Sequence, residues 1–245
     1  YSSIISGIAN QIDGGALYYT YNSSIVAGNN NCINYSCNAI ILGGCLNYMA
    51  KNPFIEGGGF VNSSILSGSS NKVYGNESSI ISGCMNTINY GISSIIGGGN
   101  CNTIQTSPGG LYLGGLRTCR SAIIGGVCNR INGSCEVVIL GGERNTLITS
   151  NDAAIIAGQG LSFSSVCNRV IVPTLILASA STTRPHINFI AGASPSSPSN
   201  GDMWYDGTNF WIRSGSQSFT LPGSTASATA TTNNAASNLF LFYNY

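Results

Sequence analysis

The apolar positions in the first 160 residues of the chain follow a short repeated word. Residues 78–104, SSIISGCMNTINYGISSIIGGGNCNTI, spell this word twice: two adjacent isoleucines, a small residue, a glycine and, three residues later, an asparagine. Eleven glycines close such a word, mostly at intervals of 15 or 16 residues, and they are Gly7, Gly28, Gly44, Gly59, Gly68, Gly83, Gly99, Gly115, Gly126, Gly142 and Gly158. A fixed period of this length predicts a solenoid of stacked units.

The columns of this alignment are regular. Isoleucine stands three residues before nine of the eleven glycines, interrupted by Glu56 and Tyr112, and asparagine stands three residues after nine of them. An aliphatic residue usually returns five residues after the glycine. We expect the columns to form structural ladders, with these members: Ile80, Ile96, Ile123, Ile139 and Ile155; Asn71, Asn86, Asn102, Asn129 and Asn145; and Gly83, Gly99, Gly126 and Gly142.

The residue types within one word predict its local structure. Isoleucine and valine favour strands, whereas glycine and asparagine supply the positive φ angles of turns. Each unit is therefore predicted to be a strand, a tight glycine turn that carries the asparagine, a second short strand and a return. No convincing 3.6-residue apolar stripe occurs before residue 160, so helices are not expected. The predicted fold is an all-β parallel β-solenoid, a β-roll of about eleven rungs.

The paired isoleucines predict an oligomer. Adjacent residues of a strand, such as Ile80 and Ile81 or Ile123 and Ile124, point to opposite faces. One of each pair can fill the interior of its unit, and the other needs cover. Neighbouring units cannot supply that cover because they lie along the direction of strand pairing. We therefore expect a homotrimer around an axis parallel to the stack.

The repeat N-S-S-I-x-x-G-x-x-N-x-I resembles the β-roll heads of trimeric autotransporter adhesins over residues 1–160. This resemblance implies a left-handed roll, threefold association and an adhesive role at a cell surface.

The repeat breaks at three places that carry candidate ligand-binding residues. Pro53 and Pro108 each precede a shortened interval, and the long first interval contains the sequence GGALYYTYNSS. Insertions in solenoids often carry binding, and aromatic rings suit stacking on sugars. The candidate aromatic residues are Tyr18, Tyr19, Tyr21, Phe54, Phe60 and Tyr112. The alternative is that proline and glycine only permit a kink or bulge, against which these rings pack.

The chain changes character after residue 160. Residues 161–181 are predicted to form strands that cap the roll, and residues 182–222 contain MWYDGTNFWIR, a hairpin pattern around Asp206 and Gly207. The latter segment resembles a small module near the C-termini of bacteriophage and related viral tail fibres. Residues 223–245 are expected to be a flexible linker and an apolar tail. The tail is expected to pack on another chain, and docking into the next subunit would assemble a filament end to end.

Composition and charge exclude several classes of function. Charged residues are 7% of the chain and the net charge is +1, so no nucleic acid partner is expected. The apolar runs are too short for membrane insertion. His186 is the single histidine, the nine cysteines lack zinc spacing, and the eight acids form no pair typical of a glycosidase. We therefore expect no metal, no cofactor and no catalytic residue. We also expect the cysteines to be small buried side chains and not to form a disulfide ladder.

These observations favour a non-enzymatic structural and adhesive fibre protein, outside the cell on a virion or cell surface, that binds receptors such as glycans. The first alternative is the subunit of an extracellular filament. An ice-binding solenoid and a glycan-degrading tailspike are lesser alternatives, because a regular threonine ladder and a carboxylate pair are both missing from the pattern.

Overall fold

We describe the fold from a computed structural model, which places residues 1–14, 20–50, 62–106, 118–173, 195–198 and 200–221. Every regular element in these residues is a β-strand, and they contain no helix. The all-β prediction is therefore confirmed. The chain divides into two compact units, Tyr1–Leu175 and Ile176–Tyr245, and we describe each by itself.

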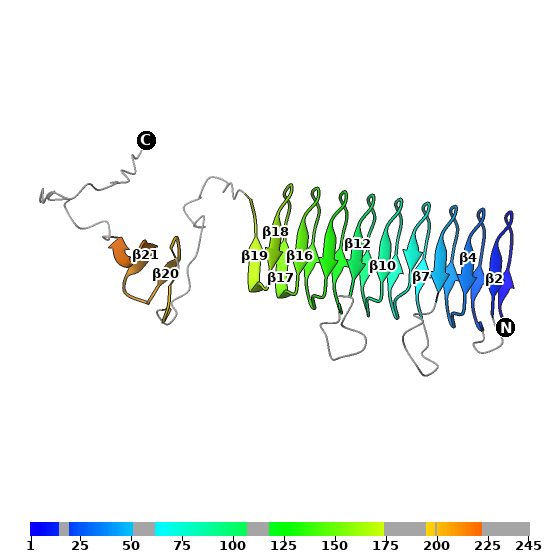
Figure 1. Ribbon diagram of the computed structural model, residues 1–245, viewed down its shortest axis with the longest axis horizontal. Coiled ribbons are helices and arrows are strands. Elements are labelled where there is room, and N and C mark those ends of the chain that lie inside the picture. Colours follow the sequence, from blue (N-terminus) through cyan, green and yellow to red (C-terminus); the bar gives the residue numbers. More distant parts are fainter. Residues whose placement is uncertain (15–19, 51–61, 107–117, 174–194, 199, 222–245) are drawn as a thin grey trace, which may run out of the picture. The chain divides into compact units, whose positions relative to one another are not determined.

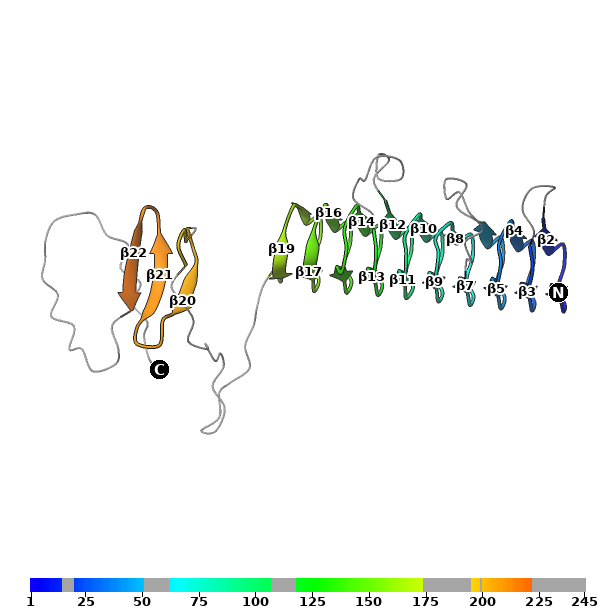
Figure 2. The ribbon, with the colours of Figure 1, turned by 90° about the horizontal axis from the view of Figure 1, so that it is seen from below.

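The first unit consists of two long parallel sheets of very short strands (Figures 1 and 2). The odd-numbered strands form one sheet, here the odd sheet: β1 (Ser3–Ile4), β3 (Ser24–Ile25), β5 (Ile40–Ile41), β7 (Ser64–Ile65), β9 (Ser79–Ile80), β11 (Ile95–Ile96), β13 (Ala122–Ile123), β15 (Val138–Ile139), β17 (Asn151–Ile155) and β19 (Cys167–Ile171).

The even-numbered strands form the other sheet, here the even sheet: β2 (Gln11–Asp13), β4 (Cys32–Asn34), β6 (Tyr48–Ala50), β8 (Lys72–Val73), β10 (Thr87–Asn89), β12 (Thr103–Gln105), β14 (Arg130–Asn132), β16 (Thr146–Ile148) and β18 (Ser162–Ser164). One odd strand and the even strand that follows it make one coil of the solenoid. This is the predicted alternation of strand, glycine turn, second strand and return.

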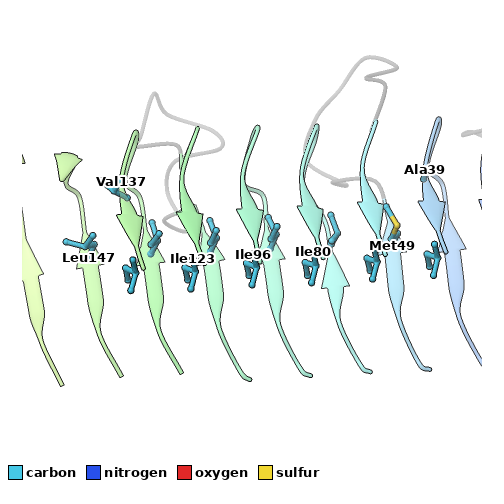
Figure 3. Packing of buried hydrophobic residues seen from close by; sticks show 14 of the residues in the cluster. Ala39, Met49, Ile80, Ile96, Ile123, Val137 and Leu147 are labelled. Carbon is cyan, nitrogen blue, oxygen red and sulfur yellow. The ribbon is translucent and has the colours of Figure 1, made fainter. Parts of the chain in front are cut away.

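In the second to eighth coils the interior is filled mainly by one large side chain from each sheet. Ile80 of β9 is in register with Ile96 of β11, which is in register with Ile123 of β13, and all three are fully buried. The even sheet contributes a matching buried column, which includes Ile88 and Ile104. Figure 3 shows the two columns as parallel rows of side chains between the sheets. Ile139 and Ile155 continue the first column. A core of two aliphatic side chains per coil explains why the period is so short.

The glycine turn requires both a positive φ angle and the absence of a side chain. At Gly83 φ is +96°, and an added Cβ would collide with the carbonyl oxygen of Gly99 on the next coil. Gly99, Gly126 and Gly142 have the same conformation and the same close approach. The turn is therefore built from backbones that stack directly on one another.

Asparagine does not supply the second positive φ angle of this turn, contrary to the expectation from sequence. That angle belongs to the preceding residue, for example Met85, with φ of +55°. Asn86 is instead completely buried, and its amide Nδ2 donates to the carbonyl oxygens of Ser82 and Gly99 at 3.2 and 3.0 Å. The ladder members Asn71, Asn102, Asn129 and Asn145 are buried in the same way. The asparagine column therefore satisfies buried backbone groups rather than bending the chain.

The prediction of eleven rungs from the glycine count is wrong. Ile41 pairs directly with Ile65, and Ile96 pairs directly with Ile123, so no coil lies between these partners. The glycines at positions 59 and 115 fall in residues 51–61 and 107–117, outside the described residues. The two shortened intervals therefore belong to insertions between neighbouring coils. The ten strands of the odd sheet are separated by nine spacings of ~4.8 Å, which give this sheet a length of about 43 Å.

The solenoid also continues past residue 160. β18 pairs in parallel with β16, and β19 pairs in parallel with β17, so residues 162–171 add to both sheets. Phe163 takes the place of the core aliphatic residue, in register with Leu147. These strands extend the stack in its own direction up to Ile171.

The described part of the second unit is a three-stranded antiparallel sheet of β20 (Met203–Tyr205), β21 (Phe210–Ser214) and β22 (Gln217–Leu221). Asp206 holds the first turn: its Oδ1 accepts hydrogen bonds from the backbone N–H groups of Thr208 and Asn209. Its Oδ2 accepts one from Trp211 Nε1 at 2.7 Å. These bonds favour the carboxylate, the bond from the Asn209 N–H most of all, and they lower the pKa of Asp206 below its ordinary value.

Candidate functional site

The outer face of the odd sheet carries an apolar column that the chain leaves exposed. Each buried isoleucine is followed by an outward-pointing residue, and the backbone of each such residue is bonded to the next coil. Ile81 is 41% exposed and Ile124 is 50% exposed, although the isoleucine beside each is fully buried. The other large exposed members between the second and ninth coils are Leu42, Leu66, Leu140 and Ile156. Gly97 is the one position in this run without a side chain.

A second column on the same face is also largely uncharged. It lies on the other side of the buried isoleucines, and its register partners are Ser24, Ile40, Ser64, Ser79, Ile95, Ala122, Val138 and Ala154. Ile40 and Ile95 are 41% and 36% exposed. The outer face of the odd sheet therefore presents two adjacent columns without a formal charge from the second to the ninth coil, one apolar and the other a mixture of aliphatic residues and serine.

The outer face of the even sheet is polar and carries charge. One of its columns contains Tyr48, Lys72, Thr87, Thr103, Arg130 and Thr146, in register from coil to coil. The second column contains Asn34, Ala50, Asn89, Gln105, Asn132 and Ile148. The two faces of the solenoid thus differ in chemistry, since only the even sheet offers amides, hydroxyls and charges along its whole length.

A pair of tyrosines marks one region of the even face. The rings of Tyr48 and Tyr74 are 5.6 Å apart and tilted by 51°. Both side chains are half-buried, and Lys72, in register with Tyr48, is exposed. Asn34 Nδ2 lies 3.5 Å from the Tyr48 hydroxyl, and Asn34 Oδ1 is buried without a hydrogen-bond partner among the described residues. This region joins aromatic rings, an amide and an ammonium group, the groups that recognise a sugar ring and its hydroxyls.

The ionisation of Tyr74 matches its half-buried position. Partial burial raises the pKa of Tyr74, and the neighbouring Tyr48 and Tyr90 add to the shift. The phenol of Tyr74 is therefore neutral at physiological pH and keeps its proton for donation to a ligand.

Of the six aromatic residues suggested by the sequence, only Tyr21 lies in the described residues. Its ring is 38% exposed, and its hydroxyl is hydrogen-bonded to the Cys37 side chain on the next coil. Tyr18, Tyr19, Phe54, Phe60 and Tyr112 lie outside the described residues. The tyrosine pair is not evident from the sequence, because Tyr48 and Tyr74 belong to intact coils and not to the breaks in the repeat. Their separation of 26 residues gives no local signal.

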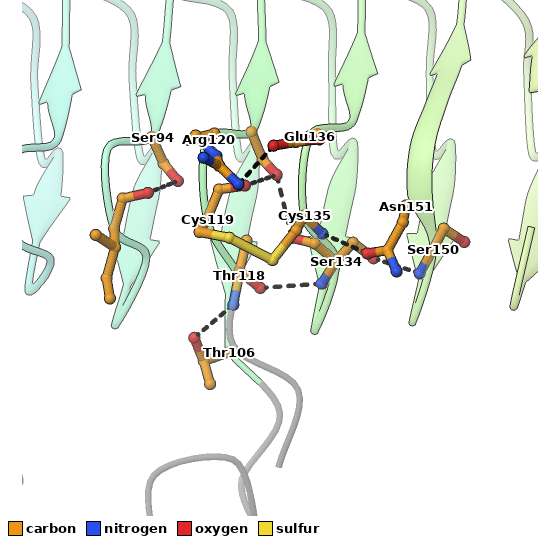
Figure 4. The surroundings of a disulfide bond; sticks show 12 residues. Ser94, Thr106, Thr118, Cys119, Arg120, Ser134, Cys135, Glu136, Ser150 and Asn151 are labelled. Atoms are coloured by element: carbon orange, nitrogen blue, oxygen red, sulfur yellow. Dashed lines mark hydrogen bonds and ion pairs between the residues drawn. A yellow bond between two sulfur atoms is a disulfide. The ribbon is translucent and has the colours of Figure 1, made fainter. Parts of the chain in front are cut away.

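A disulfide between Cys119 and Cys135 connects neighbouring coils immediately after residues 107–117 (Figure 4). The Cα atoms are 4.7 Å apart, and the two cysteines are bridge partners. Beside them Arg120 and Glu136, also on adjacent coils, form an ion pair of 2.5 Å. Sequence analysis expected no disulfide ladder, and a single intrachain bond is what the described cysteines form. Its partners are separated by one period, so the column could have been recognised from the alignment.

The described residues contain no group of three or more histidine, cysteine, aspartate or glutamate side chains able to hold a metal ion. They also contain no helix long and apolar enough to cross a membrane. Comparisons of the chain with family models, with curated proteins and with solved structures find no match.

Proposed function

We propose that this protein is a non-enzymatic structural and adhesive fibre protein that acts outside the cell, on a virion or cell surface. Its solenoid is the shaft of a homotrimer, and the outer face of the odd sheet faces the partner chains. The observation that carries this proposal is the exposed apolar column of Leu42, Leu66, Ile81, Ile124, Leu140 and Ile156 on a chain with only 7% charged residues. A long apolar patch of this kind is typical of protein–protein interfaces.

The number of chains rests on the resemblance of the repeat to the heads of trimeric autotransporter adhesins. Three flat solenoids with one apolar face each can surround a common axis and bury those faces together. This arrangement leaves the three even faces outward, so the polar and aromatic groups remain available to a receptor. The resemblance of residues 182–222 to a tail-fibre module supports the same extracellular setting.

The ligand class proposed for the even face is a carbohydrate. Tyr48 and Tyr74 present rings for stacking on the apolar side of a sugar, and Lys72 and Asn34 supply groups that bond to hydroxyls or a carboxylate. The site needs no catalytic group, in agreement with the absence of a carboxylate pair from the sequence pattern.

A glycan array tests this function. The full chain should bind a subset of oligosaccharides, and the double variant Tyr48→Ala, Tyr74→Ala should lose at least about tenfold in affinity. Ile148→Ala is the matched control, because it truncates a half-buried side chain on the same face several coils away and should bind like the wild type. A wild-type chain that binds no glycan, or a double variant that binds unchanged, would contradict the proposal.

A further inference from the structure

Three cysteines lie on successive coils along the edge formed by the glycine turns. Cys101 and Cys128 occupy the same position, two residues after Gly99 and Gly126, with φ angles of 56° and 55°. Cys84 lies on the preceding coil, one residue after its glycine, where its bridge partner is Asn100.

The backbones around Cys101 and Cys128 are paired one to one. Asn100 and Val127, the residues before them, are bridge partners. The N–H of Asn129, the residue after Cys128, donates to Asn102 Oδ1 at 3.0 Å. The two cysteines are therefore direct neighbours on adjacent coils, whereas Cys84 is displaced by one position along the chain.

The side chains of this pair lie close enough to affect each other's ionisation. The Cys101 thiol donates to Asn100 Oδ1 at 3.2 Å, and burial, followed by the nearby Cys128 thiol, raises the pKa of Cys101. Cys128 is exposed and Cys101 is half-buried, so a small reagent reaches the Cys128 sulfur first.

The spacing of this solenoid is compatible with a disulfide between neighbouring coils. The bonded cysteines Cys119 and Cys135 are also bridge partners on adjacent coils, with Cα atoms 4.7 Å apart. This separation lies within the range of disulfides, about 4.4–6.8 Å. The free pair also lies on adjacent coils, at the other turn, each cysteine one residue after the bridge partners Asn100 and Val127.

We propose that Cys101 and Cys128 are a second disulfide site, which closes when the protein meets a low-molecular-weight disulfide such as glutathione disulfide. The Cys128 thiolate attacks one sulfur of the reagent, and the first reagent thiol leaves. The Cys101 thiol then loses its proton and attacks the Cys128 sulfur, which expels the second reagent thiol. The protein gives up two electrons and two protons, and the reagent is reduced to two thiols.

This bond would connect the coils on the two sides of residues 107–117. Cys101 precedes that insertion and Cys128 follows it, so the link and the Cys119–Cys135 bond together would join three successive coils. We expect closure to raise the midpoint of thermal unfolding of the solenoid by roughly 5–10 °C.

Peptide mapping of the full chain tests the proposal directly. The protein is incubated with glutathione disulfide, its remaining thiols are alkylated, and it is digested with trypsin without reduction. Cleavage after Lys72, Arg117, Arg120 and Arg130 places Cys128 in residues 121–130, and Cys101 together with Cys84 in residues 73–117. The expected product is a cross-link between these two peptides.

Two variants identify the cysteine involved. Cys84→Ser should keep the cross-link, and Cys101→Ser should abolish it. Cys45→Ser is the matched control, since Cys45 lies at the same turn with Asn29 and Ser69 as bridge partners, and it should leave the map unchanged. The link between the peptides of Cys119 and Cys135 reports that each variant is folded. Glutathione adducts on both peptides without a cross-link, or a cross-link that persists in Cys101→Ser, would overturn the proposal.

Discussion

The side-chain Oδ1 of Asn86 accepts a hydrogen bond from the backbone N–H of Asn102, 3.0 Å away on the next coil. The same bond recurs between Asn102 and Asn129 and between Asn129 and Asn145. Each of these buried asparagines therefore bonds to the turn of its own coil through Nδ2 and to the turn of the following coil through both Nδ2 and Oδ1. This column is the main polar connection inside the stack.

Replacement of Asn86 by alanine should destabilise the solenoid strongly. It leaves the buried Asn102 N–H without its acceptor and the Ser82 carbonyl oxygen without its side-chain donor. It also removes one of the two donors to the Gly99 carbonyl oxygen, which keeps the Cys84 N–H. We expect a loss of roughly 2–4 kcal/mol in the free energy of unfolding. Circular dichroism during urea unfolding measures this loss. The control Asn29→Ala removes an exposed amide at the turn and should lower the free energy of unfolding by less than about 0.5 kcal/mol. Equal losses for the two variants would contradict a specific role for the asparagine column.

Replacement of Gly83 by alanine tests the close stacking of the glycine turns. The new Cβ would collide with the Gly99 carbonyl oxygen and with Asn86 Nδ2, at a φ angle of +96° that alanine rarely adopts. We expect a loss of roughly 2–4 kcal/mol in the free energy of unfolding. The same urea experiment measures this loss.

Gly125 provides the matched control for Gly83, because a Cβ at that position meets no atom within 4 Å. Gly125→Ala should be neutral or slightly stabilising. A Gly83→Ala variant that unfolds at the wild-type urea concentration would show that the coils are not stacked as described.

Acid should weaken the C-terminal sheet through Asp206. The pKa of this carboxyl is lowered in the folded state, so its stabilising effect is present above the unfolded value of about 3.9 and is lost as the pH falls through the folded pKa. Urea unfolding followed by tryptophan fluorescence at pH values from 6 to 2 isolates this unit, since both tryptophans, Trp204 and Trp211, belong to it. The wild type should lose resistance to urea below about pH 4.

The variant Asp206→Asn should be less stable than the wild type at pH 6 and should lose most of the pH dependence, because an amide cannot accept the Trp211 hydrogen bond as a carboxylate does. Asp152→Asn, an exposed position in the solenoid, should leave the fluorescence titration unchanged. A wild-type sheet that is equally stable at pH 6 and pH 2 would contradict the role of Asp206.

The sequence predicted the coil well because each element of the coil has its own residue type. The positions of Ile80 and Ile96 require a β-branched side chain, and the position of Gly83 requires that there be no side chain. These requirements made the columns visible in the alignment. The number of coils was mispredicted because residues 51–61 and 107–117 contain glycines that resemble turn positions. The pairings of Ile41 with Ile65 and of Ile96 with Ile123 reveal that these glycines do not mark coils of their own.

The polar interior was harder to foresee. The first serine of the repeated word is buried at the second turn, where Ser78 Oγ donates to the Asn76 carbonyl oxygen and accepts from the Ser94 N–H. No role for these serines could be predicted from the sequence, because a serine in a chain with few charges is as compatible with the surface as with the interior. The tyrosine pair on the even face was missed for a related reason: its members meet only through the register of the coils.

We propose that the outer face of the odd sheet joins three copies of this chain, and the molar mass in solution decides whether it does. Multi-angle light scattering of the full chain at several concentrations should give three times the 25.3 kDa mass of one chain. The double variant Ile81→Lys, Ile124→Lys places charges in the exposed column, leaves Ile80 and Ile123 in the core, and should be a folded monomer. The control Thr87→Lys, Thr103→Lys, on the outer face of the even sheet, should remain a trimer. A wild-type chain with the mass of a monomer or dimer, or a lysine variant of the odd sheet that stays trimeric, would contradict the claim.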